Sequence, residues 1–171
     1  MPFPHSDACD LRLARDEDSP GIVALVGLCF RPYAHCWLDV NREEPGLLSP
    51  TRSFARFWVL VHRERVFATI ACTEHAVDAG DGTGPRPGVE LKKCYVHPAL
   101  RRQGVARRLV GLVEDHARTG RRPLVELWSD TRFETAHAVY AGLGYWKTGE
   151  RRALNDISDT EEFRFVKRLA P

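Results

Sequence analysis

The sequence of 171 residues lacks the features that mark exported, zinc-binding or membrane-spanning proteins. Its five cysteines are an odd number and form no C-x-x-C pair, which argues against a disulfide framework and a zinc site. No apolar run approaches the ~20 residues that a membrane span requires. The first ten residues lack the charged-then-apolar layout of a signal peptide. We therefore expect a cytoplasmic protein with reduced thiols, no metal and no membrane partner.

The charge of the chain argues against a general nucleic-acid-binding role. Lysine and arginine number 25, and aspartate and glutamate number 23, so the formal net charge is only +2. Basic residues cluster locally, around 101–108 and 118–122, without the interleaved aromatics that line single-strand-binding grooves. A small basic module using these clusters is a third functional hypothesis, and we expect no nucleic-acid partner.

Length and composition predict one domain. Hydrophobic residues make up 43% of the chain, which is enough for a sizeable core. We interpret residues 1–9 as a short disordered leader and residues 10–171 as a single domain, because no repeat, low-complexity tract or linker divides them. The sequence does not determine the oligomeric state, and a homodimer stays open.

Hydrophobic periodicity and turn residues predict a mixed α/β fold with a largely antiparallel sheet and one local parallel pair of strands. Asp18-Ser19-Pro20 is typical of a helix start, and Thr131 with Glu134 forms a capping-box pattern before another helix. The remaining expected elements are strands at 11–15, 56–62, 66–73, 89–96, 124–128, 145–154 and 163–169, a short helix near 35–41, a mobile loop at 79–88, and a helix after residue 104 that ends at Gly120.

The segment from Val89 to Ala106 carries the most informative pattern. A predicted strand ends at His97-Pro98, and an arginine-rich loop then leads into the start of a helix. The N-terminus of a helix carries partial positive charge and free N–H groups, and it binds phosphate readily. Gly104 lets the backbone approach a ligand closely. This arrangement predicts a diphosphate site, and the alternative is a basic helix cap with solvated arginines.

The phosphate motif is neither of the two common nucleotide-binding patterns. The sequence has no G-x-x-x-x-G-K-[ST] and no G-x-G-x-x-G, which excludes a P-loop and a Rossmann fingerprint. The R-x-x-G-x-A spacing of residues 101–106 after a strand instead resembles the GNAT superfamily of acyl-CoA-dependent N-acyltransferases. In that family, this loop holds the pyrophosphate of coenzyme A.

A second motif supports the resemblance. The family follows the phosphate-loop helix with a strand and then a helix bearing A-x-x-x-Y-x-x-x-G-[FY], which is matched here by Ala136, Tyr140, Gly144 and Tyr145. The resemblance covers residues 10–169 and implies the GNAT fold, a mixed, mostly antiparallel sheet flanked by helices. One departure is Phe133, because the family often has at this place an asparagine that helps to seat the pantetheine arm.

The resemblance implies acetyl-CoA as co-substrate and assigns residues to it. The backbones of Cys94, Tyr95 and Val96 would bind the pantetheine amides and the thioester oxygen. The pyrophosphate would be held by the loop residues Arg101, Arg102, Gln103, Gly104, Val105 and Ala106. Tyr140 would protonate the leaving thiolate; the alternative is a core aromatic with a satisfied hydroxyl.

Glu90 is the candidate general base. It lies six residues before Val96, and an even separation keeps both on one face of a strand unless a bulge intervenes, as is frequent in this family. The alternative is an ion-pair partner for Lys92 or Arg86. His97 is the rival base because of its near-neutral pKa. We expect His97 to pack or cap instead, next to Pro98.

Two further segments have residues suited to an acceptor. The segment that resembles the family's acceptor pocket contains Tyr33, His35, Trp37, Asp39, Glu43 and Glu44, whose acids suit a cationic amine; a charged surface loop is the alternative. Residues 127–133 place Trp128, Asp130 and Arg132 at a strand-to-helix junction, where a capping network with a solvated Arg132 is the alternative to a substrate site.

These observations lead to one functional prediction and one main rival. We predict an N-acetyltransferase that transfers acetyl from acetyl-CoA to a primary amine by direct attack in a ternary complex. The acceptor is a small-molecule or peptide amine of unknown identity. The rival is a non-catalytic acyl-CoA-binding regulatory domain of the same fold.

Overall fold

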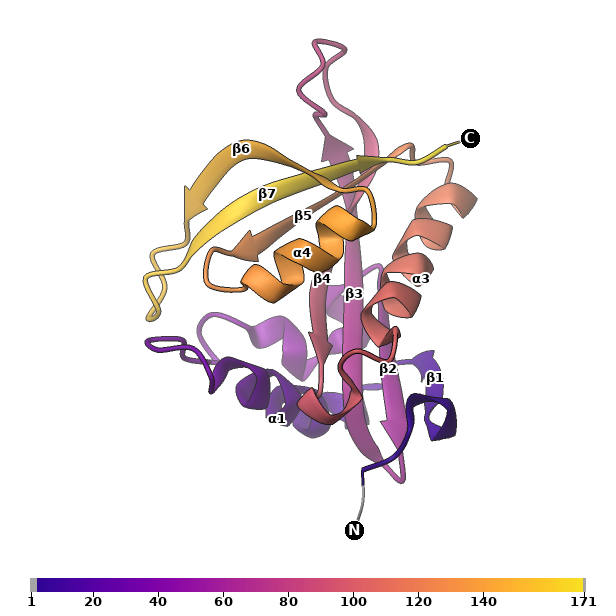
Figure 1. The fold of residues 1–171 in the computed structure, drawn as a ribbon, viewed down its shortest axis with the longest axis vertical. Helices are drawn as coiled ribbons and strands as arrows, with labels where there is room; N and C mark the ends of the chain where they lie inside the picture. Colours follow the sequence, from indigo (N-terminus) through magenta and orange to yellow (C-terminus); the bar gives the residue numbers. More distant parts are fainter. Residues whose placement is uncertain (1–2, 171) are drawn as a thin grey trace.

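A computed structural model describes residues 3–170 as one seven-stranded sheet with helices on both faces (Figure 1). The strands are β1 (Asp10–Leu13), β2 (Arg56–His62), β3 (Arg65–Val77), β4 (Arg86–Val96), β5 (Leu124–Asp130), β6 (Trp146–Ala153) and β7 (Glu161–Arg168). The α-helices are α1 (Ser19–Phe30), α2 (Pro50–Ser53), α3 (Val105–Thr119) and α4 (Glu134–Gly142). The 3-10 helices are η1 (Ser6–Ala8), η2 (Asp16–Asp18), η3 (Pro45–Leu48) and η4 (Pro98–Leu100).

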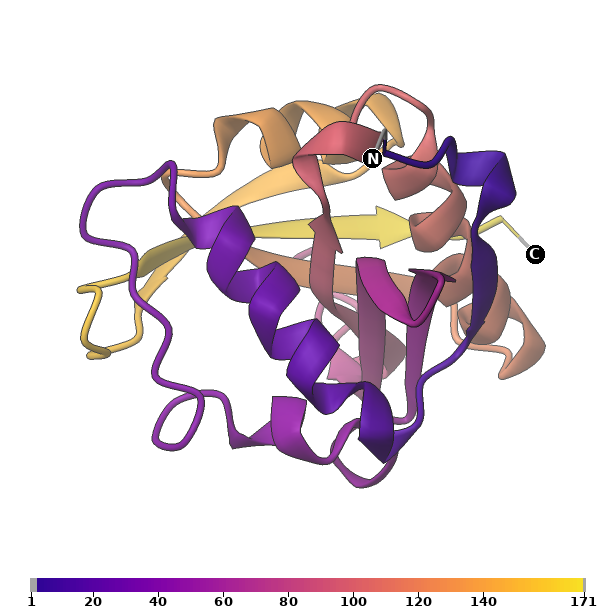
Figure 2. The same cartoon turned by 90° about the horizontal axis from the view of Figure 1, so that it is seen from below.

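The strands follow the order β1-β2-β3-β4-β5-β7-β6, and every neighbouring pair is antiparallel except β4 and β5. Parallel neighbours need a long crossover, and α3 provides it. This arrangement confirms the predicted fold class. Figure 2 shows α3 and α4 on one side of the sheet and α1 on the other.

Two hydrophobic clusters, one on each face, hold the layers together. Leu60 of β2 packs with α3 and α4 residues, whereas its neighbours Val59 and Val61 pack with α1. This alternation follows from the two-residue period of a strand, and it is why the central strands are apolar on both faces. Because both faces of the sheet are buried, a ligand can enter at the ends of the strands or where two neighbouring strands separate.

Two predicted local structures are wrong. Residues 35–41 contain no helix, and helical turns form instead at η3 and α2, each beginning with a proline at its first position. The predicted capping box also fails, because α4 begins at Glu134 with Phe133 at its N-cap and no side-chain cap. Thr131 instead donates its backbone N–H to the carbonyl of Glu161 at the start of β7.

Other predicted elements are found close to their expected places. Helix α1 begins at Ser19 with Pro20 in its first turn, and the β2–β3 hairpin turns at Arg63 and Glu64, whose φ values of 45° and 63° suit a tight turn. Residues 3–9 of the expected leader include η1, whose Ser6 is buried. Residues 1 and 2 lie outside the described residues, and the division of the chain into leader and domain stays a prediction. Among residues 3–170, no helix is both long enough and apolar enough to cross a membrane.

Gly88 allows β3, β4 and β5 to approach one another where the parallel pairing begins. A Cβ at this position would lie 2.9 Å from Cβ of Val77 and 3.2 Å from the carbonyl oxygen of Leu124. Gly88→Ala should therefore lower the free energy of unfolding by about 1–3 kcal/mol. Gly111→Ala in α3, where a Cβ meets nothing within 4 Å, should instead raise it by about 0.5–1 kcal/mol. Urea denaturation measures both, and equal effects of the two substitutions would contradict the prediction.

Candidate functional site

The parallel pairing of β4 with β5 is short, and the two strands then separate. Gly88–Leu91 pair with Leu124–Leu127, after which both strands continue without pairing to each other. Residues 92–96 of β4 therefore have no β5 partner in the described sheet. Figure 1 shows β5, β6 and β7 running at a steep angle to the β1–β4 strands. The separation exposes backbone groups in the middle of a sheet, where a ligand can pair with them.

A bulge in β4 lies within this unpaired stretch. The step from Thr69 to Ala71 in β3 faces the longer step from Lys92 to Tyr95 in β4, so β4 holds one extra residue. Lys93 adopts a left-handed φ of 54°, and its carbonyl accepts a hydrogen bond of 2.8 Å from the Thr69 hydroxyl. An extra residue reverses which face later side chains occupy. The even spacing between Glu90 and Val96 therefore does not place them on one face.

The loop after β4 has the conformation of an anion cradle. Gly104 is the N-cap of α3 with φ 75°, and a Cβ there would meet nothing within 4 Å. The N–H groups of the first turn of α3, which begins with Val105 and Ala106, have no intrahelical partner. Arg101 and Arg102 are both exposed beside this turn. The predicted phosphate loop thus has free donors, local positive charge and open space, which together fit a diphosphate.

Two loop side chains are already engaged within the protein. Gln103 donates to the Ala99 carbonyl at 3.1 Å and accepts from the Ser6 backbone N–H at 3.0 Å. Arg101 Nε donates to the Val96 carbonyl at 3.3 Å, which also accepts from the Cys29 thiol. The Gln103 side chain therefore fixes the loop, and the Val96 carbonyl already has partners.

A cavity of about 440 Å³ occupies the opening between β4 and β5. Its wall includes Cys94 and Tyr95 of β4 and Ala136 and Tyr140 of α4, together with Phe54 on the α1 side of the sheet. A volume of this size is typical of a small-molecule site. The cavity thus brings together the predicted pantetheine strand and the predicted acid, and it reaches both faces of the sheet.

Tyr140 and Cys94 lie next to each other at this cavity. Burial, together with the neighbouring Cys94 thiol, raises the pKa of Tyr140 well above its usual value. Burial also raises the pKa of the Cys94 thiol to about 12. Both groups hold their protons at neutral pH. Tyr140 therefore carries a proton that it could donate, and Cys94 is not available as a thiolate nucleophile.

Glu90 lines the same cavity and forms an ion pair. Its carboxylate accepts a hydrogen bond of 2.7 Å from Lys92, and Arg152 lies 4.0 Å away. The ion-pair alternative foreseen for Glu90 is thus present, although its side chain still borders the cavity.

His97 lies apart from the cavity lining. Its Nδ1 accepts from the Ala99 N–H, its ring packs between Phe3 and Phe67, and burial lowers its pKa. It packs and caps, as expected.

The junction between β5 and α4 is a clamp, and Arg132 is not the solvated residue of the predicted alternative. Its guanidinium forms an ion pair of 2.7 Å with Asp130, and it also donates to the carbonyl of His35 and the hydroxyl of Thr160. These bonds join the segment after α1 to the β6–β7 turn. One arginine thereby links three segments beside the cavity, whose wall includes Asp130 and Thr160.

Phe133, at the place of the family's asparagine, belongs to an aromatic cluster. Its ring centroid lies 4.7 Å from that of Tyr33 and 5.9 Å from that of Phe30, which in turn contacts Tyr95. The cluster connects α1 to the start of α4 across the cavity. An apolar wall therefore stands where the family pattern has a polar amide.

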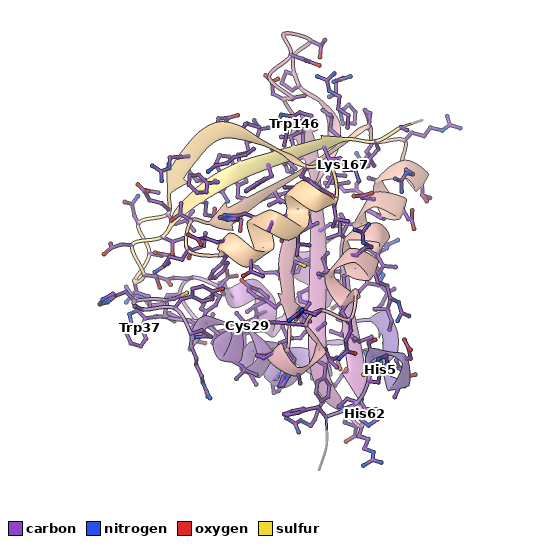
Figure 3. The ribbon with its side chains drawn as sticks, in the orientation of Figure 1. His5, Cys29, Trp37, His62, Trp146 and Lys167 are labelled. Atoms are coloured by element: carbon purple, nitrogen blue, oxygen red, sulfur yellow. The ribbon has the colours of Figure 1, made fainter. Side chains whose placement is uncertain are left out.

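Carboxylates predominate on the cavity wall. The lining contains Glu43, Glu44, Glu90, Asp130, Asp156 and Glu162 against Lys92, Lys93 and Arg152, a formal excess of three negative charges. Several acids have local partners: Glu44 pairs with Lys93 at 2.5 Å, and Glu43 accepts the Ile157 N–H. Trp37 is 61% exposed and lies at the outer edge of the fold (Figure 3).

Comparison with known proteins identifies the family. The model of the acetyltransferase (GNAT) family matches residues 17–145. This chain belongs to that family. The match spans both motifs and confirms the resemblance deduced from them, and acetyl transfer is the general activity that it indicates. No curated protein matches the sequence.

Solved structures of GNAT proteins share the fold at low sequence identity. A GNAT acetyltransferase from Staphylococcus aureus Mu50 is 14% identical with a TM-score of 0.75, covering 95% of this chain and 100% of its own. The yncA protein of Salmonella typhimurium, solved with its cofactor acetyl-CoA, is 16% identical with a TM-score of 0.65, covering 95% of each chain. The PaiA N-acetyltransferase of Thermoplasma acidophilum, in complex with coenzyme A, is 14% identical with a TM-score of 0.69, covering 94% of this chain and 99% of its own.

Proposed function

We propose that this GNAT protein transfers the acetyl group of acetyl-CoA to a primary amine by direct attack in a ternary complex. The observation that carries the proposal is the stretch of β4 that has no β5 partner, which leads to the anion cradle and lies next to Tyr140 at the cavity. The acetyl-CoA and coenzyme A bound to two structural relatives support the choice of co-substrate.

The loop and the unpaired strand are suited to different parts of acetyl-CoA. The N–H groups around Gly104 would hold the pyrophosphate, with Arg101 and Arg102 adding charge. The backbone groups of Cys94 and Tyr95 would pair with the pantetheine amides and donate to the thioester oxygen, where negative charge develops. Phe133 would contact the arm by packing alone.

The chemistry requires one proton to leave the amine and one to reach the sulfur. The free amine attacks the thioester carbon, the C–N bond forms, and the C–S bond breaks. Tyr140 would give its proton to the departing thiolate, and its raised pKa keeps that proton in place beforehand. Glu90 would accept the amine proton, directly or through water. With Cys94 protonated, no acyl-cysteine intermediate is required.

The charge of the cavity supports a cationic acceptor. An amine with a pKa near that of lysine, ~10.4, arrives protonated at neutral pH. A wall with more carboxylates than cations attracts such a group and repels anionic acceptors. The general test is release of free thiol from acetyl-CoA with a panel of amines. Acetyl-CoA binding without thiol release across the panel would favour the regulatory-domain alternative.

Substitutions of Gly104 test whether the loop after β4 binds the pyrophosphate. Gly104→Asp should abolish acetyl-CoA binding in isothermal calorimetry, because it places a carboxylate where the phosphates would lie. Gly104→Asn is the matched control, since asparagine has the same size, tolerates the left-handed backbone and carries no charge. It should retain more affinity. Near-native binding by a folded Gly104→Asp protein would rule out the loop as the pyrophosphate site.

A substitution of Tyr140 tests whether its hydroxyl donates the proton to the leaving thiolate. Tyr140→Phe should lower kcat by about 10²–10⁴-fold with little change in acetyl-CoA affinity, because only the transferred proton is lost. Tyr145→Phe is the control: its hydroxyl donates to buried Glu114 at 3.2 Å, away from the cavity wall, so it should cost stability and leave kcat unchanged. A fully active Tyr140→Phe enzyme would leave only a packing role.

A substitution of Glu90 tests whether its carboxylate is the general base. Glu90→Gln should depress kcat/KM most at low pH, and much of the loss should be recovered at high pH, where the acceptor amine is already deprotonated. Glu162→Gln removes another carboxylate from the same wall, where it pairs with Arg152 at 2.7 Å. It should alter acceptor KM without changing the shape of the pH–rate profile. A Glu90→Gln profile that overlays the native one would remove Glu90 from the mechanism.

A further inference from the structure

The first described residues of the chain lie against the phosphate loop. Figures 1 and 2 both show the N-terminal segment passing close to the start of α3, and Figure 3 places His5 there. The Ser6 backbone N–H donates to Gln103 Oε1 at 3.0 Å, and Ser6 is only 6% exposed. A contact across 97 positions of sequence thus joins the chain terminus to the candidate pyrophosphate site.

Gln103, the only glutamine in the sequence, is the link. Its amide nitrogen donates to the Ala99 carbonyl at 3.1 Å while its oxygen accepts from Ser6. The residues on either side of it are both left-handed, Arg102 with φ 63° and Gly104 with φ 75°. A left-handed arginine is unfavourable by itself and persists where its surroundings hold it. The two bonds of Gln103 hold this turn from the inside.

A second contact supports the beginning of the loop. The Phe3 ring packs on His97 at 5.1 Å between centroids, and His97 packs on Phe67 of β3 at 5.2 Å. The segment is tied to the sheet as well, because His62 Nδ1 lies 2.8 Å from the Ala8 carbonyl oxygen. The N-terminal segment is therefore anchored on β2, and it contacts His97 before the loop and Gln103 within it.

The space between this segment and α3 is partly open. A cavity of about 180 Å³ lies there, bordered by Ser6, Asp7, Gln103, Gly104 and Arg108. Ser6 and Gln103 both border this cavity, and their hydrogen bond links the segment directly to the loop.

We infer that residues 3–8 form a brace that holds the phosphate loop in its anion-binding conformation before acetyl-CoA arrives, with Ser6 and Gln103 as positioning residues. The inference rests on the proposed function, since it takes the loop to be the pyrophosphate site. A loop held in its bound conformation loses less entropy on binding. Removing the brace should weaken acetyl-CoA binding without affecting the chemical step.

Ser6 offers a matched pair of variants. Ser6→Pro removes the backbone N–H that Gln103 accepts, and the site suits proline because Ser6 is the first residue of η1 and His5 is extended with ψ 152°. Ser6→Ala keeps the N–H and removes only the hydroxyl. The difference between the two variants therefore reports the hydrogen bond itself.

Steady-state kinetics with acetyl-CoA and an active amine gives the first readout. Ser6→Pro should raise the KM and Kd for acetyl-CoA roughly three- to tenfold, the range for loss of one hydrogen bond. The kcat and the acceptor KM should stay unchanged, and Ser6→Ala should match the native protein in all four. Equal acetyl-CoA affinity of Ser6→Pro and Ser6→Ala would overturn the inference.

Amide hydrogen exchange without any ligand separates the brace from the proposed function. Residues 101–106 should exchange faster in Ser6→Pro than in Ser6→Ala, whereas the middle of α3 should exchange equally in both. Faster loop exchange in a protein whose native form binds no acetyl-CoA would support the brace and overturn the proposed co-substrate. Unchanged loop exchange would overturn the brace even if acetyl-CoA binds the native protein tightly.

Discussion

The candidate site depends on the early end of the parallel ladder between β4 and β5. In the described part of the chain, the strand ladder that joins the two halves of the sheet has four residue pairs, from Gly88 with Leu124 to Leu91 with Leu127. Beyond them β4 keeps pairing with β3, and β5 keeps pairing with β7. Each half therefore keeps its strand pairing up to the edge of the opening. Such an opening presents fixed backbone donors, which are effective for a ligand because they need no reorganisation on binding.

The bulge at Lys93 and the clamp at Arg132 set the two walls of this opening. The bulge turns the β4 backbone, and the Thr69 hydroxyl satisfies the carbonyl that it displaces. Arg132 ties the end of β5 to the backbone after α1 and to the β6–β7 turn. Neither feature touches the proposed reacting atoms. Both features border the place where β4 and β5 separate.

Motifs with a defined backbone requirement could be predicted from the sequence. The R-x-x-G-x-A pattern at residues 101–106 requires a strand, a left-handed glycine and a helix start, and all three are present. The β2–β3 hairpin and the helix start at Ser19-Pro20 likewise depend on local signals. The identity of the fold as a GNAT fold followed from two such motifs in the right order.

Features that depend on distant residues could not be predicted. The sequence around Thr131 predicts a helix cap, but the Thr131 N–H donates to β7 and Asp130 accepts from Arg132. Helix α4 therefore starts later, at Glu134. The segment after α1 has no periodicity, and its path is set by bonds to Arg132 and Ser158. The Ser6–Gln103 contact has no local signal at all. Hydrophobic periodicity and local propensity do not predict long-range hydrogen bonds of this kind.

The cavity wall draws residues from both sides of the sheet, with Tyr140 on the α4 side and Phe54 on the α1 side. The proposed thioester path follows α3 and α4, whereas the carboxylates Glu43 and Glu44 belong to the segment after α1. In the proposed reaction, acetyl-CoA and the amine would therefore approach from opposite faces of the sheet. If the proposed reactants enter from these two faces, the proposed ternary complex would not require an obligatory order of addition.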